Sequence, residues 1–497
     1  MYMDIFLRGH DYRYAVEQML LTLYPDERPV YPDAPGGADC VEVSLRHGKR
    51  YTVAACRLTR GGKIARAQAR FALDRAAEHV DAVRLEQRIV KLSFYRAALA
   101  LGHEKPVWGS LTGVRPAKFF VNLMERDGLS FAGAQRALTS EHGVDPDRAA
   151  LCARAAEAAL SARSSLSPED ICLYIGIPYC PTRCAYCSFV SVDAPKLLKT
   201  IPDYLDALDR EIDAVAKAVE KSSLRVISVY VGGGTPTTLS APELDRLLRK
   251  LRTAFDLGRC REFTVEAGRP DTVTEEKLAV LASRGVDRVS VNPQTMSDDV
   301  LRAIGRHHTA AQVVDTVDMV RRAGSFVLNM DLIAGLPGDT PEGFERTLDS
   351  VLALGPENVT VHTLALKKGS KFLTERAALP GGGAVGSMLD TARKSLGAAG
   401  YLPYYLYRQK YMSGSFENVG WTKPGFENLY NICIMEELCP ILAMGAGGST
   451  KLVAPGGIVR RLTAPKYPKE YMERIDDTCA AKAQIGAFFD PGTLRGV

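Results

Sequence analysis

Residues 171–187 read ICLYIGIPYCPTRCAYC, and this stretch decides the fold of the region that follows it. Its apolar, β-branched first part predicts a buried strand that ends at Ile177. The second part places Cys180, Cys184 and Cys187 at the spacing C-x3-C-x2-C. Three thiolates that converge from one tight loop suit a cubane iron–sulfur cluster in which one iron has no protein ligand. The stretch therefore predicts a metal centre at the end of a strand.

Zinc is the alternative occupant of this loop. Structural zinc sites are closed by four protein ligands. The nearest further cysteine, Cys172, lies inside the predicted strand, and the loop contains no histidine, so a cluster is favoured. Most of the other cysteines are isolated in the sequence. Five are expected to be small buried hydrophobes, namely Cys40, Cys56, Cys152, Cys172 and Cys260.

The composition is that of an ordinary globular protein. The chain has 497 residues, of which 46% are hydrophobic and 24% charged, and this length predicts more than one domain. The net charge of +5 permits an anionic ligand without requiring nucleic acid. No apolar run of about 18 residues occurs and residues 1–6 lack a signal-peptide pattern, so no membrane insertion is expected. The odd count of 11 cysteines argues against a disulfide framework and for a cytoplasmic location.

Residues 1–165 are expected to form an N-terminal α+β and helical domain, whose role the sequence leaves unknown. Between Glu42 and Asp74 this region has eight basic residues and no acidic one, a pattern that would suit RNA or another polyanion. No RNA-binding motif accompanies them, so a solvated basic face is favoured and nucleic acid is not an expected partner. The predicted strands are 4–7, 40–45 and 51–58, and the predicted helices are 12–23, 117–126, 132–142 and 148–162.

From Ile171 onward, short β-branched runs alternate with amphipathic stretches of helical length. This alternation predicts an α/β fold with a parallel sheet, and six such units predict a partial (β/α)6 barrel of the TIM type. The barrel is assigned to residues 166–375, and residues 376–497 to a C-terminal α/β extension that covers the substrate. The predicted strands are 171–177, 226–231, 262–265, 288–291, 326–333 and 358–364, and the predicted helices are 203–220, 241–255, 275–283, 311–323 and 341–354.

Several polar or glycine-rich features fall at the ends of these predicted strands. Ligand-binding residues of parallel barrels sit at the carboxyl ends of the strands. The cysteine loop follows the first strand, and the run GGGTP at 232–236 follows the second. Glu266, Gln294 and Asp331 close the third, fourth and fifth. Each feature alone is equally explained by a tight turn or a strand-end cap, but their common rim favours a ligand site.

Four stretches together resemble the oxygen-independent coproporphyrinogen III oxidase branch of the radical S-adenosylmethionine (SAM) superfamily. The resemblance covers essentially the whole chain, and its cysteine motif is specific. It implies a [4Fe-4S] cluster held by the three cysteines, with one or two SAM molecules bound beside it. The four stretches are IPYCPTRCAYCSF at 177–189, PYYLYRQK at 403–410, ENVG at 417–420 and GAGG at 445–448.

The resemblance also implies roles for residues that contact the first SAM. Tyr174 would lie beside the SAM at the cluster, and Tyr186 would hold the adenine through its backbone. Gly233, Gly234 and Thr235 would bind the methionine group. These roles describe a cofactor held by backbone and short side chains.

Further residues are implied on the remaining rim. Glu266 would bind the ribose of SAM. Gln294, Arg306 and Asp331 would hold a second SAM or the substrate region. His308, next to His307 in the same motif as Arg306, is expected to lie behind these contacts rather than among them.

The implied activity is the oxidative decarboxylation of two propionates of coproporphyrinogen III to vinyl groups, which yields protoporphyrinogen IX in haem biosynthesis. SAM cleavage at the reduced cluster would supply the radical, and a donor such as flavodoxin or ferredoxin would supply electrons. A tetrapyrrole with four carboxylates needs cations and apolar surface, although solvated charges and core packing explain the available side chains equally well. The candidates are Arg306, Arg408, Lys410 and Lys423, and Tyr404, Tyr405, Tyr407 and Trp421.

Three other functions stay open. Relatives of similar sequence bind haem as chaperones, but their His-Asn-x-x-Tyr-Trp element does not occur in this sequence. A radical SAM enzyme acting on another tetrapyrrole, or on RNA through the basic segment, is also compatible with the residues. The chain departs from the branch at Phe189, where a further cysteine is usual, at Asn292-Pro293 before Gln294, and at Ala334, where a tyrosine is usual.

Overall fold

The computed structural model describes residues 2–33, 38–73, 79–187, 197–365, 372, 379–409, 415–454 and 459–489. The chain divides into two compact units, Met1–Ala153 and Arg154–Val497. The first contains a five-stranded sheet and the second an eleven-stranded sheet.

The sheet of the first unit has the order β2-β1-β3-β4-β5. The pairs β1–β2 and β1–β3 are parallel, and β3, β4 and β5 form an antiparallel meander. Apolar side chains alternate along each strand, so one face packs against helices α1 and α2 in a single core. The strands are Tyr2–Arg8, Arg28–Val30, Cys40–His47, Tyr51–Arg60 and Lys63–Ala72, and the helices of the unit include α1 (Arg13–Leu23), α2 (His79–Ala100), α3 (Pro116–Glu125) and α4 (Phe131–Ser140).

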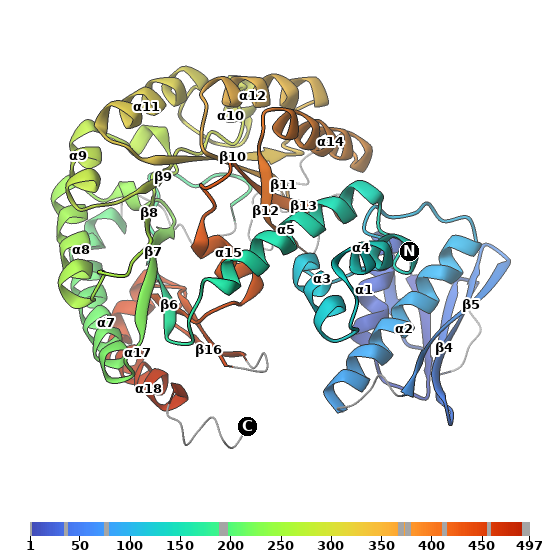
Figure 1. The fold of residues 1–497 in the computed structure, drawn as a ribbon. Helices are drawn as coiled ribbons and strands as arrows, with labels where there is room; N and C mark the ends of the chain where they lie inside the picture. Colours follow the sequence, from blue (N-terminus) through green and yellow to red (C-terminus); the bar gives the residue numbers. More distant parts are fainter. Residues whose placement is uncertain are drawn as a thin grey trace. The chain divides into compact units, whose positions relative to one another are not determined.

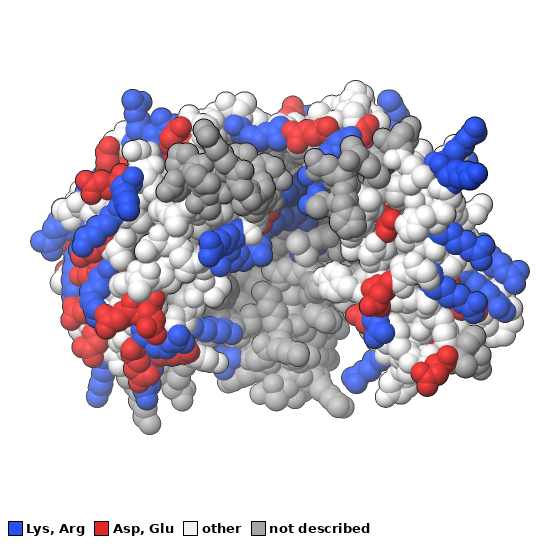
Figure 2. Space-filling view, turned by 90° about the horizontal axis from the view of Figure 1, so that it is seen from below, with Lys and Arg blue, Asp and Glu red and all other residues white. Residues whose placement is uncertain are grey.

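The basic residues of the segment from β3 to β5 point away from this core. Seven of the eight are exposed, while Arg60 is half-buried and pairs with Glu27 at 3.0 Å. Glu42 takes part in two ion pairs, with Arg57 at 3.4 Å and with Arg8 at 3.3 Å. Basic and acidic side chains are also interspersed on the face of the molecule shown in Figure 2. Within the described part of the chain, no helix is long and apolar enough to cross a bilayer.

The second unit contains the predicted barrel. Six strands pair in parallel in sequence order, and a row of aligned apolar residues crosses the sheet from Ile175 through Val231 and Val265 to Val289 and Leu328. Because the strands run in one direction, their carboxyl ends share one rim. The prediction of a partial α/β barrel is confirmed. The strands are β6 (Asp170–Ile177), β7 (Arg225–Gly233), β8 (Glu262–Glu266), β9 (Arg288–Ser290), β10 (Val327–Ala334) and β11 (Asn358–Thr363).

Helices line the outer side of this curved sheet (Figure 1). Each is amphipathic, as α8 illustrates by burying Leu244, Leu247 and Leu251. Side-chain caps define the first residues of α8, α9, α11 and α12, and in α8 Ser240 and Glu243 form a capping box. The helices are α7 (Ile201–Lys221), α8 (Ala241–Ala254), α9 (Glu275–Ser283), α10 (Asp298–Ala303), α11 (Ala310–Ala323) and α12 (Pro341–Ala353), and α5 (Pro146–Ser164) precedes β6.

C-terminal strands extend the sheet at both edges. β14 (Ile441–Met444) pairs in parallel with β6 and adds a seventh strand to the parallel run, a strand that sequence patterns did not predict. On the opposite edge β13 (Glu417–Thr422) pairs antiparallel with β11. The outermost elements are β12 (Leu402–Arg408), β15 (Ser449–Val453) and β16 (Val459–Thr463), and the helices of this region include α14 (Gly382–Ala398), α15 (Leu429–Glu436), α16 (Pro468–Glu473), α17 (Ile475–Ala481) and α18 (Ala483–Phe489).

A buried ion pair attaches the last helices to the barrel. Glu211 of α7 is fully buried, and one carboxylate oxygen lies 2.8 Å from Nζ of Lys482. Its other oxygen accepts hydrogen bonds from the Tyr471 hydroxyl at 2.6 Å and from the backbone of Gly445 at 2.7 Å. The Lys482 ammonium also donates to the carbonyl of Ala443 on β14. One carboxylate thus links α7, β14 and the C-terminal helices.

We expect Lys482→Met to destabilise the protein by about 3–5 kcal/mol, because it leaves the Glu211 charge buried without a counter-ion. Urea denaturation monitored by circular dichroism measures the change. The double variant Glu211→Gln/Lys482→Met should recover much of the loss. Lys469→Met, which breaks a solvent-exposed pair with Glu473, is the matched control and should leave the midpoint unchanged. Equal effects of both lysine substitutions would contradict the prediction.

Candidate functional site

A cavity of about 400 Å³ opens at the carboxyl ends of the barrel strands. Its volume lies within the range of small-molecule sites. All twelve site residues predicted from the sequence line it. They are Tyr174, Cys180, Cys184, Tyr186, Cys187, Gly233, Gly234, Thr235, Glu266, Gln294, Arg306 and Asp331.

Hydrogen bonds to neighbouring loops hold the cysteine loop in place. The Ala185 N–H donates to the carbonyl of Ile304 at 3.0 Å. Arg269 is buried and donates through Nη1 to both the carbonyl and the hydroxyl of Thr182, at 3.1 and 2.7 Å. Its guanidinium also pairs with Asp271 at 2.9 Å. The loop conformation therefore depends on residues that follow β8 and α10. Phe189, at which the sequence departs from the branch pattern, lies outside the described residues.

The glycine turn after β7 packs directly on this loop. The Gly234 N–H donates to the carbonyl of Ile177 at 2.8 Å, and the Thr235 N–H donates to that of Tyr179 at 2.7 Å. A Cβ atom on Gly234 would lie 2.5 Å from the Tyr179 carbonyl oxygen and 3.0 Å from Sγ of Cys180. Only glycine allows the two segments to approach this closely.

Glu266 is a half-buried carboxylate on the cavity wall. It accepts a hydrogen bond of 2.5 Å from the Tyr230 hydroxyl. Burial raises the pKa of Glu266 to about 7, with a further rise from the nearby Asp331 charge that the Tyr230 hydrogen bond opposes. A Cβ atom on Gly232 would lie 3.0 Å from the carboxyl carbon, so this glycine makes room for the side chain. Glu266 is therefore positioned as an acceptor for hydroxyl donors of a ligand.

Asp331 lies in a polar group farther along the rim. It accepts a hydrogen bond from the Asn329 amide at 2.8 Å, and Nε2 of His362 lies 3.8 Å from its other oxygen. Burial opposes ionisation of Asp331, but these two neighbours outweigh it and hold the pKa of Asp331 below its usual value. The Tyr407 hydroxyl lies 3.4 Å from Nδ1 of His362. This end of the cavity presents an ionised carboxylate and an imidazole.

Arg306 and Gln294 are held by backbone contacts. The Arg306 guanidinium donates to the carbonyls of Gly268 and Asn292 and to the Tyr186 hydroxyl, at 3.2, 3.0 and 3.1 Å. Gln294 has φ 68°, and its peptide groups bridge to β10. Its side-chain oxygen is buried without a protein hydrogen-bond partner, which leaves an acceptor available to a ligand.

Other candidates from the sequence lie away from the cavity lining. Arg408 is buried and donates to the carbonyl of Ser415, and the Lys423 ammonium donates to that of Gly355. His308 is also buried, and burial, with help from the Arg306 charge, lowers its pKa to about 4. Tyr407 does line the cavity, whereas Tyr404, Tyr405 and Trp421 are core residues outside the lining. Lys410 lies outside the described residues.

Among the lining residues that sequence reasoning missed are three polar residues near the ends of barrel strands. Arg269 follows Glu266 by three positions, Asn292 follows β9, and His362 is near the end of β11. All three obey the same strand-end rule that identified the predicted residues. Counting every polar residue within a few positions of a strand end would have found them.

Comparisons with known proteins agree with this geometry. Residues 174–351 match the model of the radical SAM superfamily. A Bacillus subtilis protein, "Oxygen-independent coproporphyrinogen-III oxidase-like protein HemZ", is 38% identical over 375 residues, which cover 74% of this chain and 75% of the relative. The chain belongs to this radical SAM family. "Heme chaperone HemW" of Haemophilus influenzae is 30% identical and matches over 60% of this chain and 75% of its own.

The solved structure of the radical SAM enzyme HemN from Escherichia coli matches with a TM-score of 0.52. The match covers 64% of this chain and 72% of that chain at 23% identity, and it supports the fold alone. The radical SAM family uses a [4Fe-4S] cluster and SAM, which are the cofactors of this chain. The cavity fits such a cluster, because three thiols line it and the missing Cβ of Gly234 leaves space beside Cys180.

We expect Gly234→Ala to prevent cluster assembly in this radical SAM protein while leaving the barrel folded. The new methyl group would collide with the Tyr179 main chain and displace Cys180. Iron content and visible absorbance after anaerobic reconstitution measure the effect. Gly397→Ala is the matched control, since a Cβ atom there would meet nothing within 4 Å. A fully loaded Gly234→Ala protein would contradict the prediction.

We expect SAM to bind more tightly above pH 7 than below it. The raised pKa keeps Glu266 neutral below about 7, and a neutral carboxyl is a poorer acceptor for ribose hydroxyls than a carboxylate. Affinity should fall up to about tenfold for each pH unit below the pKa. Anaerobic calorimetric titrations measure this step, which Glu266→Gln should remove and the exposed Glu275→Gln should retain. A pH step of the same size in Glu266→Gln would contradict the assignment of this step to Glu266.

Proposed function

We propose that this radical SAM protein catalyses the oxidative decarboxylation of coproporphyrinogen III to protoporphyrinogen IX. The observation that carries the proposal is a continuous cavity from the cysteine loop to Tyr407 and Asn418 on the C-terminal strands. The name of the HemZ relative supports it, as does a Pseudomonas aeruginosa "Oxygen-independent coproporphyrinogen III oxidase" that is 32% identical over 239 residues. The lining of the cavity includes both the cysteine loop and the C-terminal strands, so it can combine a cofactor region with a substrate region.

The proposal gives Cys180, Cys184 and Cys187 the role of cluster ligands. The reduced cluster and SAM, when bound, supply a carbon-centred radical that removes a hydrogen atom from the substrate. The backbone of Gly233 and Gly234 lies next to Cys180, where its exposed peptide groups suit the amino and carboxylate groups of a methionine. A methionine group bound there would therefore lie next to the cysteine thiols.

The remaining cofactor contacts follow the cavity wall. Glu266 and Tyr186 both line the cavity. In this scheme Glu266 would accept hydrogen bonds from the ribose hydroxyls of SAM, and the backbone of Tyr186 would hold the adenine. Tyr174, stacked at 6.4 Å on Tyr230, forms part of the floor beneath them. Arg306 orients Tyr186 through the hydrogen bond to its hydroxyl. These residues position the cofactor and exclude water, and the radical chemistry belongs to the cofactor itself.

The far end of the cavity is assigned to the substrate or to a second SAM. Asp331 with His362 offers charge and hydrogen bonding there, and Gln294 offers its unpaired acceptor. Residues 376–497 contribute Gln409 and Asn418 to the same wall, which supports a substrate-covering role for this extension. A one-electron donor such as flavodoxin or ferredoxin would reduce the cluster. Residues 1–165 have no role in this scheme.

Haem binding as a chaperone is the second candidate. The observation that favours it is the set of HemW relatives, among them the Haemophilus influenzae protein at 30% identity and a Bacillus subtilis protein at 35% identity over 204 residues. A chaperone of this kind would hold haem stoichiometrically without producing vinyl groups.

We expect the reconstituted, reduced protein to form vinyl products from coproporphyrinogen III and SAM under anaerobic conditions. Each vinyl group should appear with one 5′-deoxyadenosine and one CO2, because one hydrogen atom and one carboxylate leave each propionate while one electron passes to an acceptor. Mass spectrometry quantifies both products. Cys184→Ala should abolish them, whereas Cys260→Ala, which removes a half-buried cysteine outside the cavity lining, should not. SAM cleavage without vinyl products would refute the assigned substrate, and tight haem binding without turnover would favour the chaperone.

A further inference from the structure

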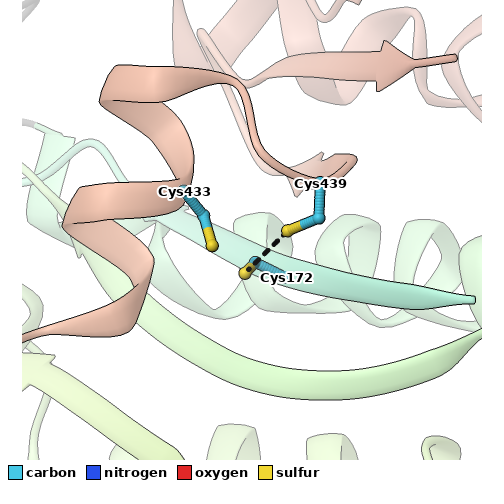
Figure 3. Close-up of side chains that lie close together, drawn as sticks. All are labelled: Cys172, Cys433 and Cys439. Atoms are coloured by element: carbon cyan, nitrogen blue, oxygen red, sulfur yellow. Dashed lines mark hydrogen bonds between the residues drawn. The ribbon is translucent and has the colours of Figure 1, made fainter. Parts of the chain in front are cut away.

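Three buried cysteines meet beneath the floor of the cavity. Cys172 lies on β6, Cys433 on α15, and Cys439 in the segment that leads into β14, and their side chains point toward one another (Figure 3). All three sulfur atoms lie within 4.8 Å of one another, and those of Cys172 and Cys439 are 3.6 Å apart. Residues separated by more than 250 positions thus converge on one point.

The surroundings of these thiols are dry and apolar. Cys172 and Cys433 are completely buried and Cys439 is 3% exposed. They belong to one cluster with Ile227 and Ile441. Among the residues that the structure describes, this is the one group of three or more His, Cys, Asp or Glu side chains whose ligand atoms all lie within 4.8 Å of one another. The sequence alone had suggested only that Cys172 is a small buried hydrophobe.

The spacing of the sulfurs matches a single soft ion. A metal–sulfur bond of about 2.3 Å places two thiolates about 3.8 Å apart in tetrahedral geometry and about 4.0 Å apart in a trigonal plane. The measured 3.6 Å between Cys172 and Cys439 is close to these values. Thiolates select monovalent copper, and a cation offsets the cost of burying their charge. Structural zinc sites are closed by four protein ligands, and only three converge here among the described residues.

We propose that Cys172, Cys433 and Cys439 bind one Cu⁺ ion between their three thiolates, as a site separate from the iron–sulfur cluster. The three residues belong to three different segments of the second unit, so the ion would join β6, α15 and the start of β14. It would reinforce the parallel β6–β14 pairing, in which Cys172 aligns with Ile441.

The location gives this ion a positioning role for the cavity floor. Glu262 anchors the start of α15 by accepting hydrogen bonds from the backbone of Leu429 and Tyr430, at 2.8 and 2.7 Å. Cys433 lies one turn later, so the ion would fix the other end of the same turn. Tyr430 between them stacks at 4.5 Å on Tyr230, which in turn hydrogen-bonds Glu266. The site would hold the tyrosines on which the cavity wall rests.

Metal analysis of the full-length reconstituted protein tests the proposal. We expect one equivalent of copper per chain in addition to the cluster iron, measured by elemental analysis after reconstitution with Cu⁺, and no stoichiometric zinc. Cys433→Ser and Cys439→Ser should each lose this ion and keep the iron, and Cys260→Ser should keep both. Melting temperature should rise on metal addition in the parent protein and in Cys260→Ser only. The readouts do not depend on turnover, so failure of the proposed reaction would leave them unaffected.

An anaerobic Cu⁺ titration separates this site from the cysteine loop. In the full chain carrying Cys180→Ala, Cys184→Ala and Cys187→Ala, added Cu⁺ should produce ultraviolet thiolate-to-copper charge-transfer absorption that saturates at one equivalent. Adding Cys433→Ser should abolish the signal. Absence of the signal in the folded triple variant would overturn the proposal. A native disulfide between Cys172 and Cys439, detected by peptide mapping in metal-free protein, would overturn it as well.

Discussion

Two backbone hydrogen bonds between the cysteine loop and the glycine turn determine how the site is built. Gly234 and Thr235 donate to the carbonyls of Ile177 and Tyr179, so the ends of β6 and β7 lie against each other. The parallel register of the two strands brings these groups to the same height. Because Gly234 has no side chain, Cys180 can occupy the space next to the turn. The thiols and the half-buried glycine backbone consequently line one cavity.

Carboxylates in the barrel differ in how completely neighbouring groups of the protein satisfy their hydrogen-bonding capacity. Glu211 has an ammonium partner and two hydrogen-bond donors. Glu262 accepts from Ser228 and from two backbone N–H groups, although burial still raises its pKa. Glu266 has a single side-chain donor, Tyr230, and faces the cavity. A carboxylate with remaining acceptor capacity gains most from a ligand that supplies hydroxyl donors.

The C-terminal segments complete the barrel rather than forming a separate layer. β14 adds to the β6 edge and β13 to the β11 edge, and Tyr407 and Asn418 from this region line the cavity. Closing the edges in this way satisfies backbone groups that an isolated six-stranded sheet would expose. It also makes the cavity floor depend on α15, whose tyrosine stacks beneath the cofactor wall.

The sequence by itself determined the parallel barrel and the rim residues, because both follow from local patterns. β-branched runs alternating with amphipathic stretches located β6 to β11 to within a few residues, and the strand-end rule then brought Cys180, Glu266 and Asp331 to one rim. Only the tertiary structure decided the pairing of β14 with β6, the ion pair between Glu211 and Lys482, and the meeting of Cys172 with Cys439. These contacts join segments more than 250 positions apart, where no periodicity links one partner to the other. Their geometry arises because the C-terminal part of the chain returns to pack on β6 and α7, which local propensity does not encode.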